Sequence, residues 1–178
     1  VRRWTANLIG TIGPDRDVLT PEFADDADLM AWALDTLAGH TDGAANSAVT
    51  GKPLEMGGSA NQEDAVARGL HVILRLASAH FGLGPVGGLS VVIQGAGVVG
   101  GNLARILHEE GHKVVGLSDV HIALHDPNGL DVPELLKHRF AHGRLPDEAT
   151  GTATVVTEEE FLRLPCDVLA PCAISMAV

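Results

Sequence analysis

The sequence has few basic residues, few cysteines and no long apolar run. Its 12 lysines and arginines face 23 aspartates and glutamates, which gives a formal net charge of −11. A field of that sign repels phosphate backbones and anionic lipid, so we expect neither nucleic acid nor a membrane surface as partner. No run of about 18 apolar residues is present, and no hydrophobic signal core follows the first residues. These absences predict a soluble, cytoplasmic protein.

The two cysteines, Cys166 and Cys172, are spaced neither as a disulfide framework nor as a zinc site, and we expect buried thiols. Apolar residues make up 46% of the 178 residues and charged residues 20%, which is ordinary globular usage. The chain should therefore build a core, as one domain or as one domain with part of another. Because it starts without Met and stops on an apolar run over 173–178, we expect a partial chain.

The chain is expected to alternate helices with buried strands. Apolar residues at three- and four-residue steps predict helices over 25–37, 59–82, 102–110 and 130–140. Short apolar runs predict strands buried on both faces over 89–93 and 114–117, and two further strands over 153–156 and 167–170. Capping boxes are expected to open two helices, one at Ser59 with Gln62 and one at Thr157 with Glu160. This order predicts an α/β fold, with a Rossmann-like parallel sheet and helices on both faces.

A glycine pattern of the form G-x-G-x-x-G follows the first predicted strand and opens a predicted helix. It comprises Gly95, Ala96, Gly97, Val98, Val99 and Gly100. Each glycine has its own physical reason, since Gly95 permits a tight turn and Gly97 lets the backbone approach a pyrophosphate. Gly100 allows helix and strand to pack closely. The helix N-terminus offers free N–H groups to the phosphates, so the pattern predicts a dinucleotide site.

Asp119 stands at the end of the next predicted strand, where a dinucleotide site needs an acid. Its carboxylate would accept hydrogen bonds from the adenosine ribose, and its charge disfavours a 2′-phosphate. We therefore expect NAD as cofactor in preference to NADP. The alternative is that the glycines only make a close turn between strand and helix.

His108 to His112 match the zinc-protease pattern H-E-x-x-H, which we reject as a metal site. Zinc needs both histidines on one continuing helix, and Gly111 is expected to end this helix before His112. No metal is expected elsewhere. Two further histidine pairs repeat the four-residue spacing and are expected at the surface, the second at a solvated helix end: His121 with His125, and His138 with His142.

Several segments in their order resemble the glutamate dehydrogenase family, which includes leucine, phenylalanine and valine dehydrogenases. They are IGPDRDV (12–18), MAW (30–32), VTGKPLEMGGS (49–59), the glycine turn with SD (118–119), and DVLAPCA (167–173). The resemblance implies reversible, nicotinamide-dependent oxidative deamination of an L-amino acid to a 2-oxo acid and ammonia. It also implies a cleft between two domains and assembly into a homohexamer.

By this resemblance the chain is partial. Residues 1–45 would be the tail of the substrate domain, 46–88 a linking loop and helix, and 89–178 an incomplete NAD-binding Rossmann domain. The family's segment with the catalytic lysine lies upstream, and its C-terminal helices are absent as well. The resemblance places Glu22 at the position of the catalytic aspartate, one methylene longer, and Cys172 and Ala173 among the cofactor-binding residues.

The sequence departs from the family pattern at positions expected to contact nicotinamide. Gln62 replaces an arginine, Val66 a threonine, and Val98 and Met176 each an asparagine. An apolar group facing an amide leaves buried donors unpaired, at roughly 1–3 kcal/mol each. Two alternatives to an active enzyme therefore stay open. One is a catalytically impaired regulatory or assembly subunit that binds nucleotide or amino acid and joins an active homologue in a hetero-oligomer; the other is a truncated, non-functional product.

Overall fold

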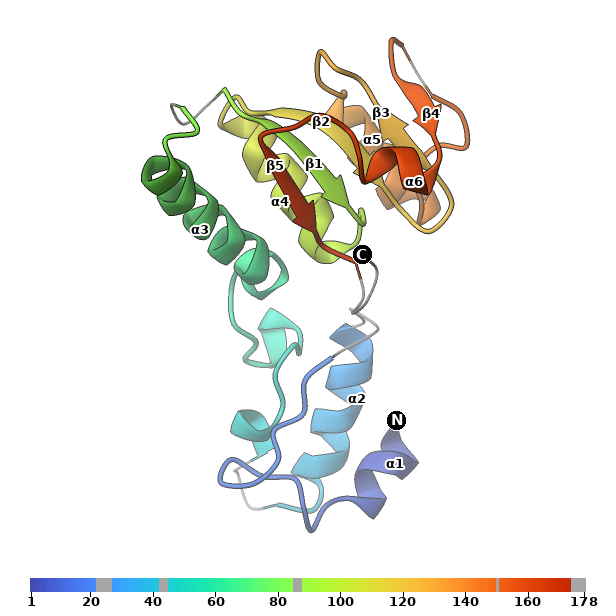
Figure 1. Ribbon diagram of the computed structural model, residues 1–178. Coiled ribbons are helices and arrows are strands. Elements are labelled where there is room, and N and C mark those ends of the chain that lie inside the picture. The colour runs from blue at the N-terminus through green and yellow to red at the C-terminus, as the bar shows by residue number, and fades with distance from the viewer. Residues whose placement is uncertain (22–26, 42–44, 85–87, 150, 174–178) are drawn as a thin grey trace. The chain divides into compact units, whose positions relative to one another are not determined.

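The computed structural model describes residues 1–21, 27–41, 45–84, 88–149 and 151–173 (Figure 1). It divides the chain into two compact units, Val1–Gln62 and Glu63–Val178. The assignment of 1–45, 46–88 and 89–178 to parts of two domains stays a prediction. No helix among the described residues is long and apolar enough to cross a membrane.

The first unit is built from short helices around a small core. Its elements are α1 (Arg2–Asn7), α2 (Ala27–Ala38) and the 3-10 turns η1 (Ala45–Ala48) and η2 (Leu54–Met56). The predicted helix over 25–37 is thus present from Ala27, and residues 25 and 26 lie outside the described residues. Single bridges join Ile12 to Asp17 and Leu19 to Val49, and apolar residues close the core: Ile12, Leu34, Leu37, Ala45, Ala48 and Val49.

The long helix α3 (Ala65–Phe81) belongs to the second unit and starts later than the sequence predicts. The expected capping box of Ser59 and Gln62 is wrong. Asn61 has a positive φ of 64°, which a continuing right-handed helix does not allow, and a 3-10 turn, η3 (Gln62–Asp64), follows it. The predicted end near Gly82 is confirmed, because Gly82 adopts the left-handed conformation as C-cap.

A five-stranded sheet in the order β4-β3-β2-β1-β5 forms the centre of the second unit (Figure 1). Its strands are β1 (Ser90–Gln94), β2 (Lys113–Ser118), β3 (Ala123–His125), β4 (Thr154–Val156) and β5 (Val168–Pro171). β1 pairs in parallel with both β2 and β5, as the sequence predicts. The sheet is nevertheless mixed, since β3 is antiparallel to β2 and to β4.

The reversal at β3 follows from the length of its connection. A parallel neighbour needs a crossover of about a dozen residues, whereas only residues 119–122 separate β2 from β3. The chain can therefore only turn back. β3 itself (Ala123–His125) went unpredicted because it lacks the β-branched residues that mark β4 (Thr154–Val156), a strand of the same length.

Helices cover both faces of the sheet, and the α/β class is confirmed. One face packs against α3, α4 (Val98–Glu109) and α5 (Val132–His142). The other face is closed by the short helix α6 (Glu158–Phe161), whose Phe161 lies against Val92 and Val115. The predicted capping box at Thr157 and Glu160 is present and opens α6. Alternate residues of β1 thus serve two separate apolar layers.

Candidate functional site

The carboxyl end of β1 turns sharply at Gly95 before α4 begins. Gly95 has a φ of +95°, and a Cβ there would lie 3.0 Å from the backbone nitrogen of Ala173. The backbone after β5 reaches this turn because the N–H of Cys172 donates to the Gln94 carbonyl at 2.8 Å. The turn therefore needs glycine twice over, for its conformation and for the close approach of the chain after β5.

The other two glycines of the pattern, Gly97 and Gly100, differ in what a side chain there would meet. A Cβ on Gly100 would lie 1.9 Å from the Gly95 carbonyl oxygen, so α4 can pack onto the turn only without a side chain there. A Cβ on Gly97 would meet no atom of the described residues within 4 Å. Among these residues, Gly97 is therefore not needed for packing, and its backbone faces open space. This is the space that a pyrophosphate would fill in a dinucleotide site.

The N-terminus of α4 adds the electrostatic element. Gly97 is the N-cap, no side chain caps it, and the first turn carries no acidic residue. The N–H of Gly101 bonds back to the Gly97 carbonyl at 2.8 Å, so the N–H groups of Val98, Val99 and Gly100 precede the first intrahelical bond. Such a helix start attracts anions. Ala96, 1% exposed, anchors the turn in the core.

Asp119 follows β2 directly, but its carboxylate already serves the fold. Oδ1 accepts the N–H groups of His121 at 2.7 Å and Ile122 at 3.0 Å, and Oδ2 accepts that of Leu145 at 2.7 Å. A carboxylate offers about four acceptor positions, so one remains for a ribose hydroxyl. Its role as ribose ligand stays a prediction. The sequence did not predict its role as a clamp, by which we mean that its carboxylate joins the backbone at 121–122 to the backbone at Leu145.

Cys172 and Ala173 line the turn on the side of β5. Cys172 is half-buried against the core, and its Cβ would lie 3.1 Å from a Cβ on Gly100. Burial raises the pKa of the Cys172 thiol, so it stays protonated at neutral pH. Ala173 is exposed beside Gly95. Cys172 therefore contributes to this turn through packing and not as a thiolate, and Ala173 contributes through its backbone.

Asn102 ties the start of α4 to the start of α3, a contact that sequence reasoning missed. Its side-chain N–H₂ donates to the carbonyl oxygens of Val98 at 2.9 Å and Glu63 at 3.2 Å. Asp64 reinforces the joint by pairing with Arg68 at 2.7 Å and Arg105 at 3.3 Å. The hydrogen bond and charge of Arg68 lower the pKa of Asp64. The first residues of α3 are thus held beside the glycine turn.

The positions that depart from the family pattern have structural surroundings of their own. The Gln62 side chain accepts the N–H of Gly51 at 2.9 Å within the first unit. Val66, in the first turn of α3, is 60% exposed. Glu22 and Met176 lie outside the described residues. The proton-transfer role expected of Glu22 therefore stays a prediction.

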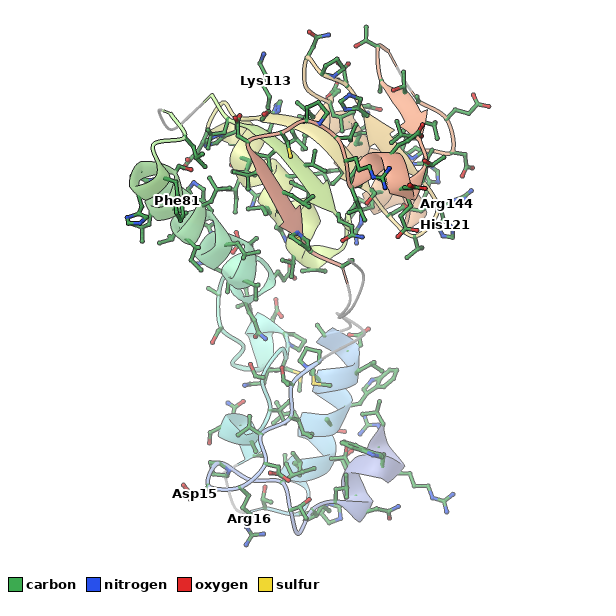
Figure 2. The ribbon with its side chains drawn as sticks, viewed as in Figure 1. Asp15, Arg16, Phe81, Lys113, His121 and Arg144 are labelled. Atoms are coloured by element: carbon green, nitrogen blue, oxygen red, sulfur yellow. The ribbon has the colours of Figure 1, made fainter. Side chains whose placement is uncertain are left out.

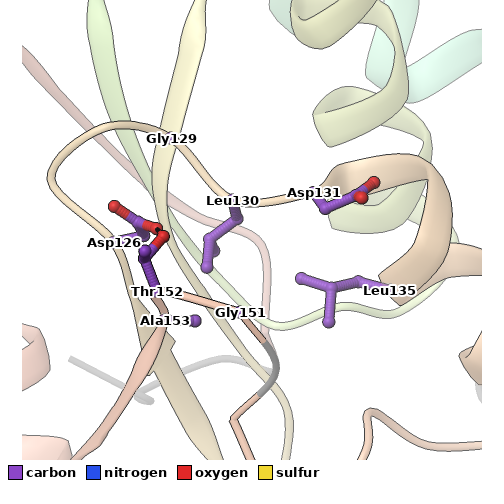
Figure 3. Close-up of a pocket in the computed structure, with 8 residues that line it drawn as sticks. All are labelled: Asp126, Gly129, Leu130, Asp131, Leu135, Gly151, Thr152 and Ala153. Carbon is purple, nitrogen blue, oxygen red and sulfur yellow. Dashed lines mark hydrogen bonds between the residues drawn. The ribbon is translucent and has the colours of Figure 1, made fainter.

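A small cavity of about 130 Å³ lies apart from the glycine turn (Figure 3). Asp126, 3% exposed, accepts the Thr152 hydroxyl and the N–H of Asn128, and these hydrogen bonds lower its pKa. Gly129 of the same cavity lies beside Lys113, at the amino end of β2. The cavity is therefore at the opposite end of β2 from Asp119. Within the described ranges no three His, Cys, Asp or Glu side chains are placed to hold a metal ion.

The fold and this turn together define an α/β protein with a glycine turn of the Rossmann type between β1 and α4. The family model described as Glutamate/Leucine/Phenylalanine/Valine dehydrogenase matches residues 57–178, and the chain belongs to that family.

Relatives within the family are dehydrogenases of glutamate. The chain is 37% identical over 163 residues to the cryptic catabolic NAD-specific glutamate dehydrogenase GudB of Bacillus subtilis, covering 92% of this chain and 37% of that one. It is 36% identical over 178 residues to the Thermotoga maritima glutamate dehydrogenase, covering 99% and 42%.

The fold is shared with a solved structure described as hetero-hexameric glutamate dehydrogenase from Thermus thermophilus in its Leu-bound form. The TM-score is 0.89 at 36% identity, over 99% of this chain and 41% of that one. The chain thus spans about two fifths of the length of the proteins it matches.

Proposed function

We propose that this chain is the dinucleotide-binding part of a cytoplasmic, NAD-dependent amino-acid dehydrogenase. The enzyme would convert an L-amino acid, water and NAD⁺ to a 2-oxo acid, ammonium, NADH and a proton. The observation that carries the proposal is the glycine turn, whose open face at Gly97 adjoins an uncapped helix N-terminus. The names of the relatives point to glutamate as substrate and to NAD as cofactor.

The described residues fit a dinucleotide in distinct ways. The N–H groups at the start of α4 would donate to the pyrophosphate, with Gly97 giving the necessary approach. The free acceptor position of Asp119 would take a ribose hydroxyl, and its charge supports NAD over NADP. When bound, NAD supplies the hydride acceptor. Glu22 is the carboxylate that we assign to proton transfer, on the family position alone.

Binding of NADH to the 178-residue chain and to its Gly97→Ala variant tests the proposal. Alanine fits at this position, since its Cβ would meet no atom within 4 Å in the described part of the chain, so the variant should fold. The same Cβ would stand in the path of the pyrophosphate. We expect the calorimetric affinity for NADH, and for ADP-ribose, to fall at least tenfold, a loss of about 1.4 kcal/mol.

Gly69→Ala is the matched control, because a Cβ on Gly69 also meets no atom within 4 Å and lies on α3. It should leave NADH binding unchanged. Equal binding by all three proteins would overturn the dinucleotide site. Glutamate turnover is then measured on a longer protein that contains this chain, and NADH binding without turnover of any amino acid would overturn the enzymatic part alone.

A regulatory or assembly subunit is the second candidate function. It is favoured by the similarity to a glutamate dehydrogenase described as hetero-hexameric, together with the departures at Gln62 and Val66. Such a subunit would bind nucleotide or amino acid and join an active homologue. Co-expression with an active glutamate dehydrogenase should then give mixed oligomers with altered kinetics. Separate elution of the two proteins from a sizing column would exclude it.

A further inference from the structure

Three histidine pairs share one spacing, but the structure gives them different surroundings. His108 lies in the last turn of α4, which ends at Glu109, and its partner His112 is buried beyond that end. His121 and His125 lie on either side of a strand start, and His125 Nδ1 is bonded to the Val115 carbonyl. Neither pair shares a helix.

His138 and His142 differ because both belong to α5. Residues four apart on a helix are neighbours on one face, and here the ring centroids are 4.4 Å apart at an angle of 42°. His142 is exposed and His138 half-buried. The two imidazoles can therefore reach one ion between them after a small rotation of the exposed ring.

The tautomer of His138 is already suited to a metal. Its Nδ1 lies 3.1 Å from the carbonyl oxygen of Arg144. Arg144 follows α5 in the chain and is labelled in Figure 2. A carbonyl can only accept, so Nδ1 carries the proton and Nε2 keeps its free lone pair. Metal-bound histidines are usually oriented by such a bond from their other ring nitrogen.

The charges around the pair also admit a cation. His142 is the last residue of α5, where the helix dipole presents its negative end. The Arg144 guanidinium is turned to Asp147 at 2.8 Å, and Lys137 is paired with Glu134 at 3.3 Å. Arg139 is the remaining cation of this last turn.

We propose that His138 and His142 form a two-histidine site for a divalent ion of a late first-row transition metal, at the carboxyl end of α5. Imidazole nitrogens suit Ni²⁺, Cu²⁺ and Zn²⁺, and water would complete the coordination. The site is independent of the proposed dehydrogenase function. The spacing of the pair alone predicted only solvated histidines; the ring contact and the fixed tautomer are what distinguish it.

Calorimetric titration of the untagged chain with Ni²⁺ at pH 7.5 tests the site. We expect one ion per chain, and an affinity at least about tenfold lower in His142→Ala, since even groups outside the ligand set change metal affinity by that factor. His138→Ala should behave alike. His108→Ala is the matched control, a histidine in the last turn of another helix with the same spacing, and should leave the affinity unchanged.

The electron paramagnetic resonance spectrum of the Cu²⁺-loaded chain gives a readout that does not depend on folding energetics. It should show two imidazole nitrogens in the parent chain and in His108→Ala, and one in His142→Ala. Binding should also weaken at acid pH, because protons compete with the metal ion for the ring nitrogens. Equal affinity in the parent and His142→Ala, or an equal loss in His108→Ala, would overturn the site.

Discussion

Gly116 shows at the scale of one residue how a missing side chain shapes the sheet. A Cβ there would lie 3.0 Å from Phe161 Cε2 and 3.2 Å from Leu164 Cδ1, and Phe161 is 1% exposed. Gly116→Ala should therefore overpack this face and lower the free energy of unfolding by about 1–3 kcal/mol. Urea unfolding followed by circular dichroism measures the change.

A double-mutant cycle checks that the loss arises at this contact. Phe161→Leu removes the ring that a Cβ on Gly116 would meet, so the cost of Gly116→Ala should be smaller in that background. If Gly116→Ala costs the same with either residue at 161, the crowding against Phe161 is not its cause.

His112 should make stability depend on pH. It is 4% exposed, neither ring nitrogen has a hydrogen-bond partner among the described residues, and burial lowers its pKa. Glu110, which is hydrogen-bonded to His71 at 2.7 Å, opposes this shift of the His112 pKa, and His71 adds to it. Because the folded pKa is below the unfolded value, the unfolded chain binds more protons between them. The contribution of His112 to the free energy of unfolding is therefore fully present above the ordinary histidine pKa, and it is lost as the pH drops below that value.

The His112→Leu variant isolates this contribution from that of every other titrating group. One group changes the unfolding free energy by at most about 1.4 kcal/mol per pH unit. Thermal unfolding between pH 5 and pH 8 should show a smaller loss at acid pH for the variant than for the parent. Parallel curves for the two proteins would show that His112 does not titrate on unfolding in this range.

The role of a residue could be predicted from the sequence where it depends on neighbours in the chain. It could not be predicted where it depends on a partner far away in the chain. Gly95 and Gly100 were predictable because Gly95 has a positive φ in the turn itself and a Cβ on Gly100 would meet the Gly95 carbonyl oxygen, whereas the approach of Ala173 to Gly95 could not be read from the turn. The clamp at Asp119 was not, since its partner Leu145 is 26 residues away. The joint between Asn102 and Glu63 is likewise invisible before the helices are placed, because 39 residues separate them.

At the scale of elements, Asp119 connects the turn after β2 with the loop after α5. Asp119→Ala would leave the N–H groups of His121, Ile122 and Leu145 without this acceptor. We expect a loss of about 1–3 kcal/mol in the free energy of unfolding for the buried donors. Asp119→Asn keeps an oxygen at Oδ1 and removes the charge, so it should cost less.

The same two variants separate the structural role from the proposed ribose contact. If Asp119 also selects the cofactor, Asp119→Asn should raise the affinity for NADPH relative to NADH, because its negative charge no longer repels a 2′-phosphate. Calorimetric affinities for both nucleotides measure this ratio. An unchanged ratio would leave Asp119 with the clamp alone.

Elements were predictable where burial gave them a clear pattern. β1 and β2 are nearly continuous apolar runs because the central strands are covered on both faces. β3 has no β-branched residue and α1 is too short to carry a period. α4 begins a turn before its predicted start, with Gly97 as its N-cap. Tertiary pairing, and not local propensity, decides such elements.

At the scale of the molecule, the two compact units have cores of unequal size. In the described part of the chain, the first unit, Val1–Gln62, has a core cluster of six buried apolar residues, whereas the second has a central sheet with an apolar layer on each face. A unit of about 60 residues buries a smaller fraction of its surface than a larger one, and it is correspondingly marginal. The two units need not unfold together.

Native-state hydrogen exchange of the whole chain should resolve them. Amides of Leu34 and Leu37 in α2 should exchange through an opening of lower free energy than those of Val92 and Ile93 in β1, because fewer apolar contacts are lost when the first unit opens. Added NADH should protect the β1 amides further and leave the α2 amides unchanged, since ligand stabilises only the unit that binds it. Equal opening energies for α2 and β1 would instead show one cooperative unit, and protection of α2 by NADH would show that the first unit shares the nucleotide site.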